Sequence, residues 1–201
     1  TGIAQSELDR KRFVYSDIGF ILLQQVVEAV TGKTLDAYLV SEFYRPMGLE
    51  HTLFQPLNRY KKADIMPTAA NDYLRRQDLC GYVHDEAAAF MGGVSGNAGL
   101  FSTAQELGKI YQMILNEGEL DGKRYLRPET CRIFTTEKSA VSHRGLGYDK
   151  PNLKDPKANA CASSAPASVY GHTGFTGTCA WVDPENDLVY IFPVSYTHLT
   201  L

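Results

Sequence analysis

The stretch SVYGHTGFTGTCAWVDPENDLVYIF, residues 168–192, decides the fold class of this chain. Apolar, β-branched and aromatic residues concentrate in Ser168–Gly171, Thr178–Val182 and Leu188–Phe192, which predicts three strands. The run Asp183–Asp187 between the last two is rich in turn-forming residues, so these two strands are expected to form a hairpin. The stretch therefore predicts an antiparallel sheet.

Helices are predicted ahead of this sheet. Apolar residues in Ser16–Val30 recur at helical spacing and fill nearly the whole circumference, which predicts a buried helix that Gly32 ends. Thr34–Tyr44, Thr103–Asn116 and Pro128–Phe134 predict three further helical segments. Helices first and a hairpin sheet later indicate the α+β class, with an antiparallel sheet flanked by helices.

The remaining segments are predicted to be mostly irregular. Residues 50–80 lack a sustained period and are expected to form a long excursion with short turns. Gly145–Tyr148 is expected to form a strand, and 149–168, rich in Pro, Ala, Ser and Lys, an exposed connection.

The composition limits the possible partners. The chain has 201 residues, a formal net charge of −3 and 44% hydrophobic residues, which is typical of a globular protein. Without a Lys/Arg block, nucleic acid is not expected as a partner. A membrane span is not expected either, because no apolar run approaches about 20 residues.

Cysteine and histidine spacing does not indicate a metal site, and we expect neither metal nor cofactor. There is no Cys-x-x-Cys pair, so the cysteines are expected to be free or buried thiols, and their redox state cannot be read from the sequence. These residues are Cys80, Cys131, Cys161 and Cys179.

Three short motifs carry candidate chemistry: Tyr15-Ser16-Asp17, Ser95-Gly-Asn-Ala-Gly-Leu-Phe-Ser-Thr103 and Gly171-His-Thr-Gly-Phe-Thr-Gly177. Each alone has an ordinary explanation. A Tyr at a helix start is more often a packing residue, and Gly-Phe-Thr-Gly is typical of a hairpin turn. Together and in this order, the motifs resemble the serine β-lactamase and penicillin-binding-protein superfamily, most closely its class C-like branch of esterases and DD-peptidases.

The resemblance implies a role for each matching residue in a reaction where a serine attacks a carbonyl and forms an acyl-enzyme. Tyr15 matches the family's tyrosine, a base that works only if nearby cations favour the phenolate. His172 would supply positive charge or a hydrogen bond beside it. Thr173 and Gly174 would let the substrate backbone approach the strand edge. The N–H of Phe175 would be one donor of the oxyanion hole.

The chain also departs from the family pattern. Asp17 stands where the family has Asn, and a carboxylate cannot donate the hydrogen bond with which an amide holds a substrate carbonyl. With His172 in place of Lys, the pattern favours esterase-like or peptidase-like members over efficient β-lactamases. Gly93-Val-Ser95-Gly-Asn97 resembles a nucleophile elbow, but its last position is Asn and no strand clearly precedes it, so Ser95 is not expected to be a nucleophile.

The largest departure concerns the nucleophile. The family carries it in Ser-x-x-Lys, and this sequence contains none; the nearest match, Thr135-Thr-Glu-Lys138, begins with Thr. We therefore expect 1–193 to be a partial domain, incomplete at both ends, with 194–201 as a non-native tail. A missing nucleophile helix would also leave an uncovered apolar patch on the predicted helix Ser16–Val30.

The expected parent protein is a serine hydrolase acting on an ester, an amide or a cell-wall peptide, and the chain by itself is expected to be inactive. The resemblance extends to domains fused behind β-N-acetylglucosaminidases, which implies a fused glycosidase, a cell-wall context and a periplasmic or extracytoplasmic location. The alternative is a non-catalytic module that binds peptidoglycan or a partner domain.

Overall fold

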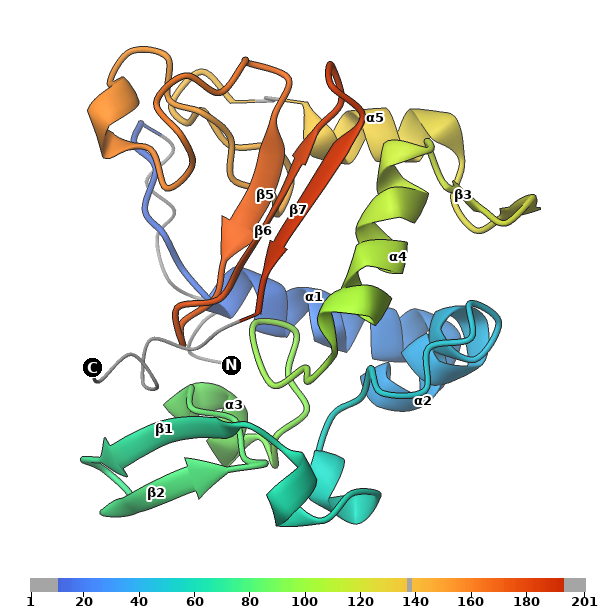
Figure 1. Ribbon diagram of the computed structural model, residues 1–201, viewed down its shortest axis with the longest axis vertical. Coiled ribbons are helices and arrows are strands. Elements are labelled where there is room, and N and C mark those ends of the chain that lie inside the picture. The colour runs from blue at the N-terminus through green and yellow to red at the C-terminus, as the bar shows by residue number, and fades with distance from the viewer. Residues whose placement is uncertain (1–10, 137–138, 194–201) are drawn as a thin grey trace.

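The computed structural model describes residues 11–136 and 139–193 (Figure 1), so the predicted tail 194–201 lies outside the described residues. The helices are α1 (Ile18–Thr31), α2 (Leu35–Leu39), a π-helical turn (Val40–Tyr44), α3 (Glu86–Phe90), α4 (Ala104–Leu115) and α5 (Pro128–Thr135), with short 3₁₀ turns at Pro56–Asn58, Lys62–Asp64 and Pro156–Ala158. The strands are β1 (Pro67–Asp72), β2 (Gln77–Cys80), β3 (Glu119–Leu120), β4 (Lys123–Arg124), β5 (Tyr170–Thr173), β6 (Cys179–Asp183) and β7 (Leu188–Phe192).

The sheet is antiparallel in the order β5–β6–β7, and α4 packs beside β7 (Figure 1). Trp181 in β6 pairs with Gly171 on one side and with Tyr190 on the other. The strand predicted at Ser168–Gly171 begins two residues later, so His172 lies inside β5. The α+β prediction, with its terminal hairpin and helices, is confirmed.

Two predictions of irregular or extended structure are wrong. Gly145–Tyr148 is not a strand: the Gly145 N–H donates to the Tyr148 carbonyl (3.0 Å), and Gly147 has φ +87°, which closes the segment into a turn. Within 50–80, β1 and β2 form an antiparallel hairpin. Its register shifts twice, which breaks the alternation that would reveal a strand pair in the sequence.

Helix α1 forms where predicted, and Gly32 ends it at φ +67°. The expectation that it is buried is wrong, because Gln24 is the one residue of α1 that is buried. Ile18, Leu22, Leu23 and Val26 are 45–57% exposed and Val30 is 80% exposed. The described residues leave this apolar face uncovered.

The buried core lies between the π-helical turn and α4. It is made of Tyr44, Met47, Leu49, Met113 and Leu120, each less than 8% exposed. Burial raises the pKa of Tyr44 to about 12, so this phenol stays neutral at physiological pH. The core fixes the start of the segment that leads to the β1–β2 hairpin.

A buried carboxylate ties this segment to α4. Glu106 accepts hydrogen bonds from the backbone N–H groups of Glu50 (2.8 Å) and His51 (2.9 Å) and from the Thr52 hydroxyl (2.7 Å). Burial is the largest single influence on the pKa of Glu106 and raises it, but these hydrogen bonds together outweigh burial and lower the pKa. The ionised form therefore holds residues 50–52 in place.

Replacing Glu106 by Gln is expected to lower the free energy of unfolding by about 2–3 kcal/mol at pH 7, because an amide supplies one uncharged acceptor in place of a carboxylate. Because the pKa of Glu106 is lower in the folded protein than in the unfolded chain, ionised Glu106 stabilises the fold at pH values above its unfolded pKa. This stabilisation is lost as the pH falls through its folded pKa. The difference between the two proteins, measured by urea unfolding, should therefore shrink below about pH 4. Glu129→Gln, at an exposed carboxylate in α5, should change stability by less than about 0.5 kcal/mol. Equal losses of unfolding free energy in the two variants would contradict the proposed role of Glu106 in holding residues 50–52.

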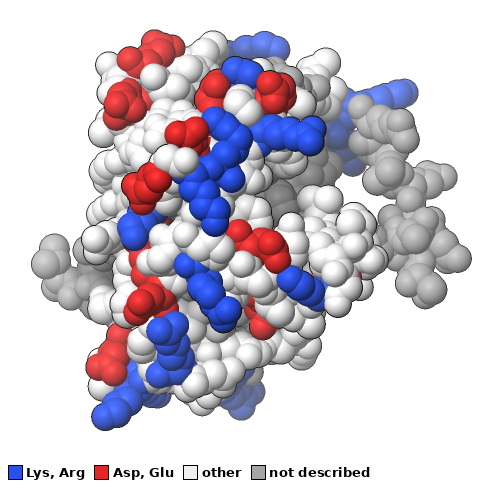
Figure 2. Space-filling view, turned by 90° about the vertical axis from the view of Figure 1, so that its right-hand side faces the viewer, with Lys and Arg blue, Asp and Glu red and all other residues white. Residues whose placement is uncertain are grey.

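The face seen in Figure 2 carries Lys and Arg interspersed with Asp and Glu, so the described residues on this side do not form one continuous basic surface. Within the described ranges, none of the helices has the length and apolar character needed to cross a bilayer.

Candidate functional site

The structure brings Tyr15 and His172 together, although 157 positions separate them (172 − 15). Tyr15 lies three residues before α1, and His172 lies in β5. Their ring centroids are 6.3 Å apart with the rings tilted by 41°. The start of α1 therefore lies against the β5 side of the sheet, and the two candidate side chains face the same region.

Arg144 is a third member of this cluster, and the sequence analysis missed it. Its guanidinium lies 5.5 Å from the centre of the Tyr15 ring, contacts His172 Nε2 and lies 3.4 Å from Asp149 Oδ1. The backbone of Asp149 pairs with Gly171 in β5 through two hydrogen bonds of 2.7 and 3.0 Å, which places Arg144 beside the strand. A single Arg in an irregular segment has no sequence signal, so only the fold identifies it.

Both nitrogens of the His172 ring have contacts. Nε2 contacts the Arg144 guanidinium. Nδ1 lies 2.6 Å from the Thr173 carbonyl oxygen. Arg144 places a permanent positive charge beside Tyr15.

Thr173, Gly174 and Phe175 follow directly at the end of β5 and are exposed. The Gly174 N–H donates to the Thr178 carbonyl (2.7 Å), which closes the loop between β5 and β6. A Cβ on Gly174 would lie 2.3 Å from Thr178 Oγ1, so a larger residue here would require the Thr178 side chain to move. Phe175 contacts the ring of His84, with the centroids 4.8 Å apart.

Asp17 lies next to this cluster in the sequence but serves α1. Its carbonyl accepts from the N–H groups of Phe20 (3.0 Å) and Ile21 (3.1 Å), and its side chain makes no capping hydrogen bond. Within the described residues it joins none of the hydrogen bonds that Arg144 and His172 make. A substrate-binding role of Asp17 stays a prediction.

Ser95 is part of the fold. It is 3% exposed, and its hydroxyl donates to Asn97 Oδ1 (2.6 Å). Gln24 of α1 holds the same segment by accepting from the Gly96 N–H (3.0 Å). A serine this buried does not present its oxygen to a substrate.

Other titratable groups near the sheet are poor bases or nucleophiles. Burial raises the pKa of Tyr111 to about 12 and also raises the pKa of Tyr148 and Tyr170. All four cysteines are free, and burial raises the pKa of Cys131, Cys161 and Cys179, which disfavours their thiolates. Among the described residues, no three His, Cys, Asp or Glu side chains lie together as metal ligands would.

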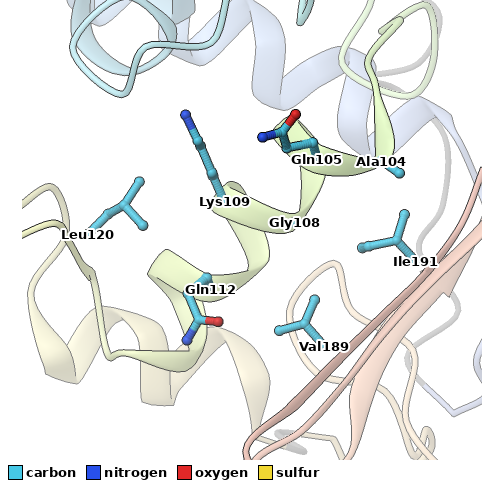
Figure 3. A pocket seen from close by; sticks show the side chains of 8 residues that line it. All are labelled: Ala104, Gln105, Gly108, Lys109, Gln112, Leu120, Val189 and Ile191. Carbon is cyan, nitrogen blue, oxygen red and sulfur yellow. The ribbon is translucent and has the colours of Figure 1, made fainter.

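Two hollows lie elsewhere on the molecule. One, of about 420 Å³, separates α4 from β7, with Leu120, Val189 and Ile191 along it and Lys109 and Gln112 projecting from the helix (Figure 3). The other, of about 330 Å³, lies between α1, α2 and the glycine-rich segment around Ser95. Neither hollow includes Tyr15, Arg144 or His172.

Comparison with known proteins identifies the family of the chain. Residues 3–199 match the Beta-lactamase family model. The chain is 36% identical over 199 residues to a protein of Escherichia coli (strain K12) named "Putative D-alanyl-D-alanine carboxypeptidase", covering 93% of the chain and 46% of that protein. It is also 36% identical over 189 residues to an N-acetylmuramyl-L-alanine amidase of Bacillus subtilis (strain 168), covering 88% of the chain and 43% of that protein. The chain thus spans about half the length of these relatives.

Solved structures share the fold at low sequence identity. A penicillin-binding protein homologue from Pyrococcus abyssi superposes with a TM-score of 0.62 at 18% identity, over 92% of this chain and 39% of that one. Simvastatin synthase from Aspergillus terreus superposes with a TM-score of 0.64 at 15% identity, over 94% of this chain and 51% of that one. The fold is the β-lactamase/transpeptidase-like fold, and on the match over residues 3–199 the chain belongs to the beta-lactamase family.

Proposed function

We propose that this chain supplies the base, the cation and one oxyanion donor of a serine hydrolase that cleaves a cell-wall peptide ending in D-Ala-D-Ala. The observation that carries the proposal is the cluster of Tyr15, Arg144 and His172 beside β5. The names of the E. coli and B. subtilis relatives support a peptidoglycan substrate and an extracytoplasmic location.

Each group of the cluster has a part in acyl transfer. Tyr15, as the phenolate, takes the proton of an attacking serine hydroxyl and becomes the neutral phenol, which then gives the proton to the leaving amine. Arg144 stabilises the phenolate that is present before and after this transfer, and His172, held by the Thr173 carbonyl, orients the guanidinium. The Phe175 N–H donates to the oxyanion of the tetrahedral intermediate. Water then hydrolyses the acyl-enzyme.

Arg144 also has the chemistry to recognise the free C-terminal carboxylate of such a peptide. A guanidinium binds a carboxylate through two parallel hydrogen bonds, and Arg144 already lies 3.4 Å from the Asp149 carboxylate. Thr173 and Gly174, exposed at the end of β5, leave room for an extended peptide backbone.

The function is tested on a longer protein, expressed from the gene that encodes these 201 residues together with the coding sequence on both sides of them (the extended product). It should release D-Ala from an N-acylated peptide ending in D-Ala-D-Ala and be labelled by a fluorescent penicillin at a Ser-x-x-Lys serine. The 201-residue chain alone should do neither. Turnover by the 201-residue chain, or an extended product that neither turns over nor becomes labelled, would overturn the proposal.

Arg144→Ala in the extended product is expected to raise KM for the peptide by about ten- to a hundredfold, because a charge-assisted pair is worth about 1.5–3 kcal/mol. The neutral ester p-nitrophenyl acetate has no free carboxylate, so its KM should change by no more than about twofold. Initial rates with both substrates measure the difference. Equal KM increases for peptide and ester would show that Arg144 does not bind the substrate carboxylate.

A second candidate function, a non-catalytic module that binds peptidoglycan, is favoured by the lack of Ser-x-x-Lys in these 201 residues. In that case the extended product would also lack the motif and resist penicillin labelling, but it would sediment with purified peptidoglycan. A labelled Ser-x-x-Lys serine excludes this function as the main one.

A further inference from the structure

The β1–β2 hairpin region and the β5–β6 loop meet at His84 and Phe175. Their ring centroids are 4.8 Å apart, and the rings are tilted by 46°. Figure 1 shows the β1–β2 hairpin at the bottom of the molecule and the sheet β5–β6–β7 above it. Phe175 is 62% exposed, whereas the His84 side chain is only 19% exposed. The buried ring therefore offers a fixed surface to the exposed one.

A buried ion pair fixes the backbone that carries His84. The Asp72 side chain has 0% exposure and accepts from Arg75 Nε at 3.1 Å. Arg75 in turn donates to the Val83 carbonyl (2.7 Å) and to the His84 carbonyl. The position of residues 83 and 84 is thereby set by the turn of the β1–β2 hairpin, independently of the sheet.

The imidazole of His84 is buried at an energetic cost. His84 Nε2 lies 3.6 Å from Asp72 Oδ2, and Nδ1 is buried with no hydrogen-bond partner among the described residues. Unsatisfied buried polar atoms are rare and costly, so a ring that keeps one is held in place by other contacts. One such contact leaves the hairpin region and is made with Phe175.

We propose that His84 is a positioning residue that holds the backbone N–H of Phe175 in its place as oxyanion donor. The inference rests on the proposed function, in which that N–H stabilises the tetrahedral intermediate. The hydrogen bond between Gly174 and Thr178 closes the loop at its base, and the largely exposed side chain of Phe175 packs on the His84 ring. This contact restricts the movement of the side chain and of the peptide group that carries it.

The position of Phe175 is tested without any turnover, by ¹⁵N relaxation of its amide in the extended product. In His84→Ala the order parameter should fall from about 0.85 toward about 0.6, and His84→Phe, which restores a ring, should bring it back. His51→Ala removes a ring that packs on Tyr60 at 5.5 Å in another segment, and it should leave Phe175 unchanged. An unchanged Phe175 amide in His84→Ala would overturn the proposal.

The second test measures turnover of the peptide by variants of His84. His84→Ala should lower kcat about ten- to a hundredfold with KM within about twofold, since a misplaced oxyanion donor acts on the transition state. His84→Phe should restore most of kcat, and His84→Asn, which keeps a polar group but no ring, should not. Rescue by Asn alone would show that the contact with Asp72 matters instead. If the wild type releases no D-Ala, the proposed function fails, and the relaxation result still decides the role of His84.

Discussion

Tyr15→Phe in the extended product is expected to lower kcat/KM for the D-Ala-D-Ala peptide about a thousandfold, the loss typical of a removed general base. The substitution deletes one oxygen and keeps the ring that packs against His172 and Arg144. Binding should be nearly unchanged, so the loss should appear in kcat, measured from D-Ala release under saturating substrate.

Tyr73→Phe is the matched control, because Tyr73 is 79% exposed in the turn between β1 and β2. It should retain full activity. The melting temperature of both variants should stay within about 2 °C of the parent, since both tyrosines are exposed. A Tyr15→Phe variant within threefold of the parent kcat would remove Tyr15 from the mechanism and leave Arg144 and His172 as substrate-binding groups.

How much of this site can be predicted from the sequence depends on how far apart in the chain the contacting residues lie. Local patterns placed α1, α4, α5 and the β6–β7 hairpin, because turn residues and hydrophobic periods act over a few positions. They could not place Arg144, which reaches His172 only because Asp149 pairs with Gly171 across 22 positions (171 − 149). The contact between His84 and Phe175 is equally non-local and follows from the buried pair of Asp72 and Arg75.

The burial of α1 could not be predicted from its composition either. An apolar circumference predicts a buried helix only if neighbouring elements cover it. In the described residues, α1 meets α2 on one side and is held to the glycine-rich segment by Gln24. The apolar residues of the other face stay exposed, which explains why a correct helix prediction came with a wrong burial prediction.

Gly171→Ala is expected to destabilise the 201-residue chain by about 3 kcal/mol, at the upper end of overpacking costs. Gly171 lies in β5 opposite Trp181. An added Cβ would lie 2.1 Å from the Ala180 carbonyl oxygen and 2.8 Å from Trp181 Cα, and these backbone atoms cannot move without breaking the ladder between β5 and β6. The melting temperature should fall by about 6–12 °C, measured by circular dichroism.

Gly108→Ala is the matched control, because the same methyl group there meets nothing within 4 Å. Gly108 lies inside α4 beside the hollow of Figure 3, so Ala should raise stability by about 0.5–1 kcal/mol through its helix propensity. The opposite signs separate steric conflict in the sheet from the general effect of adding a methyl group. If Gly171→Ala melted like the parent, β5 would not lie as close to Trp181 as the register requires, and the position of His172 beside Tyr15 would lose its support.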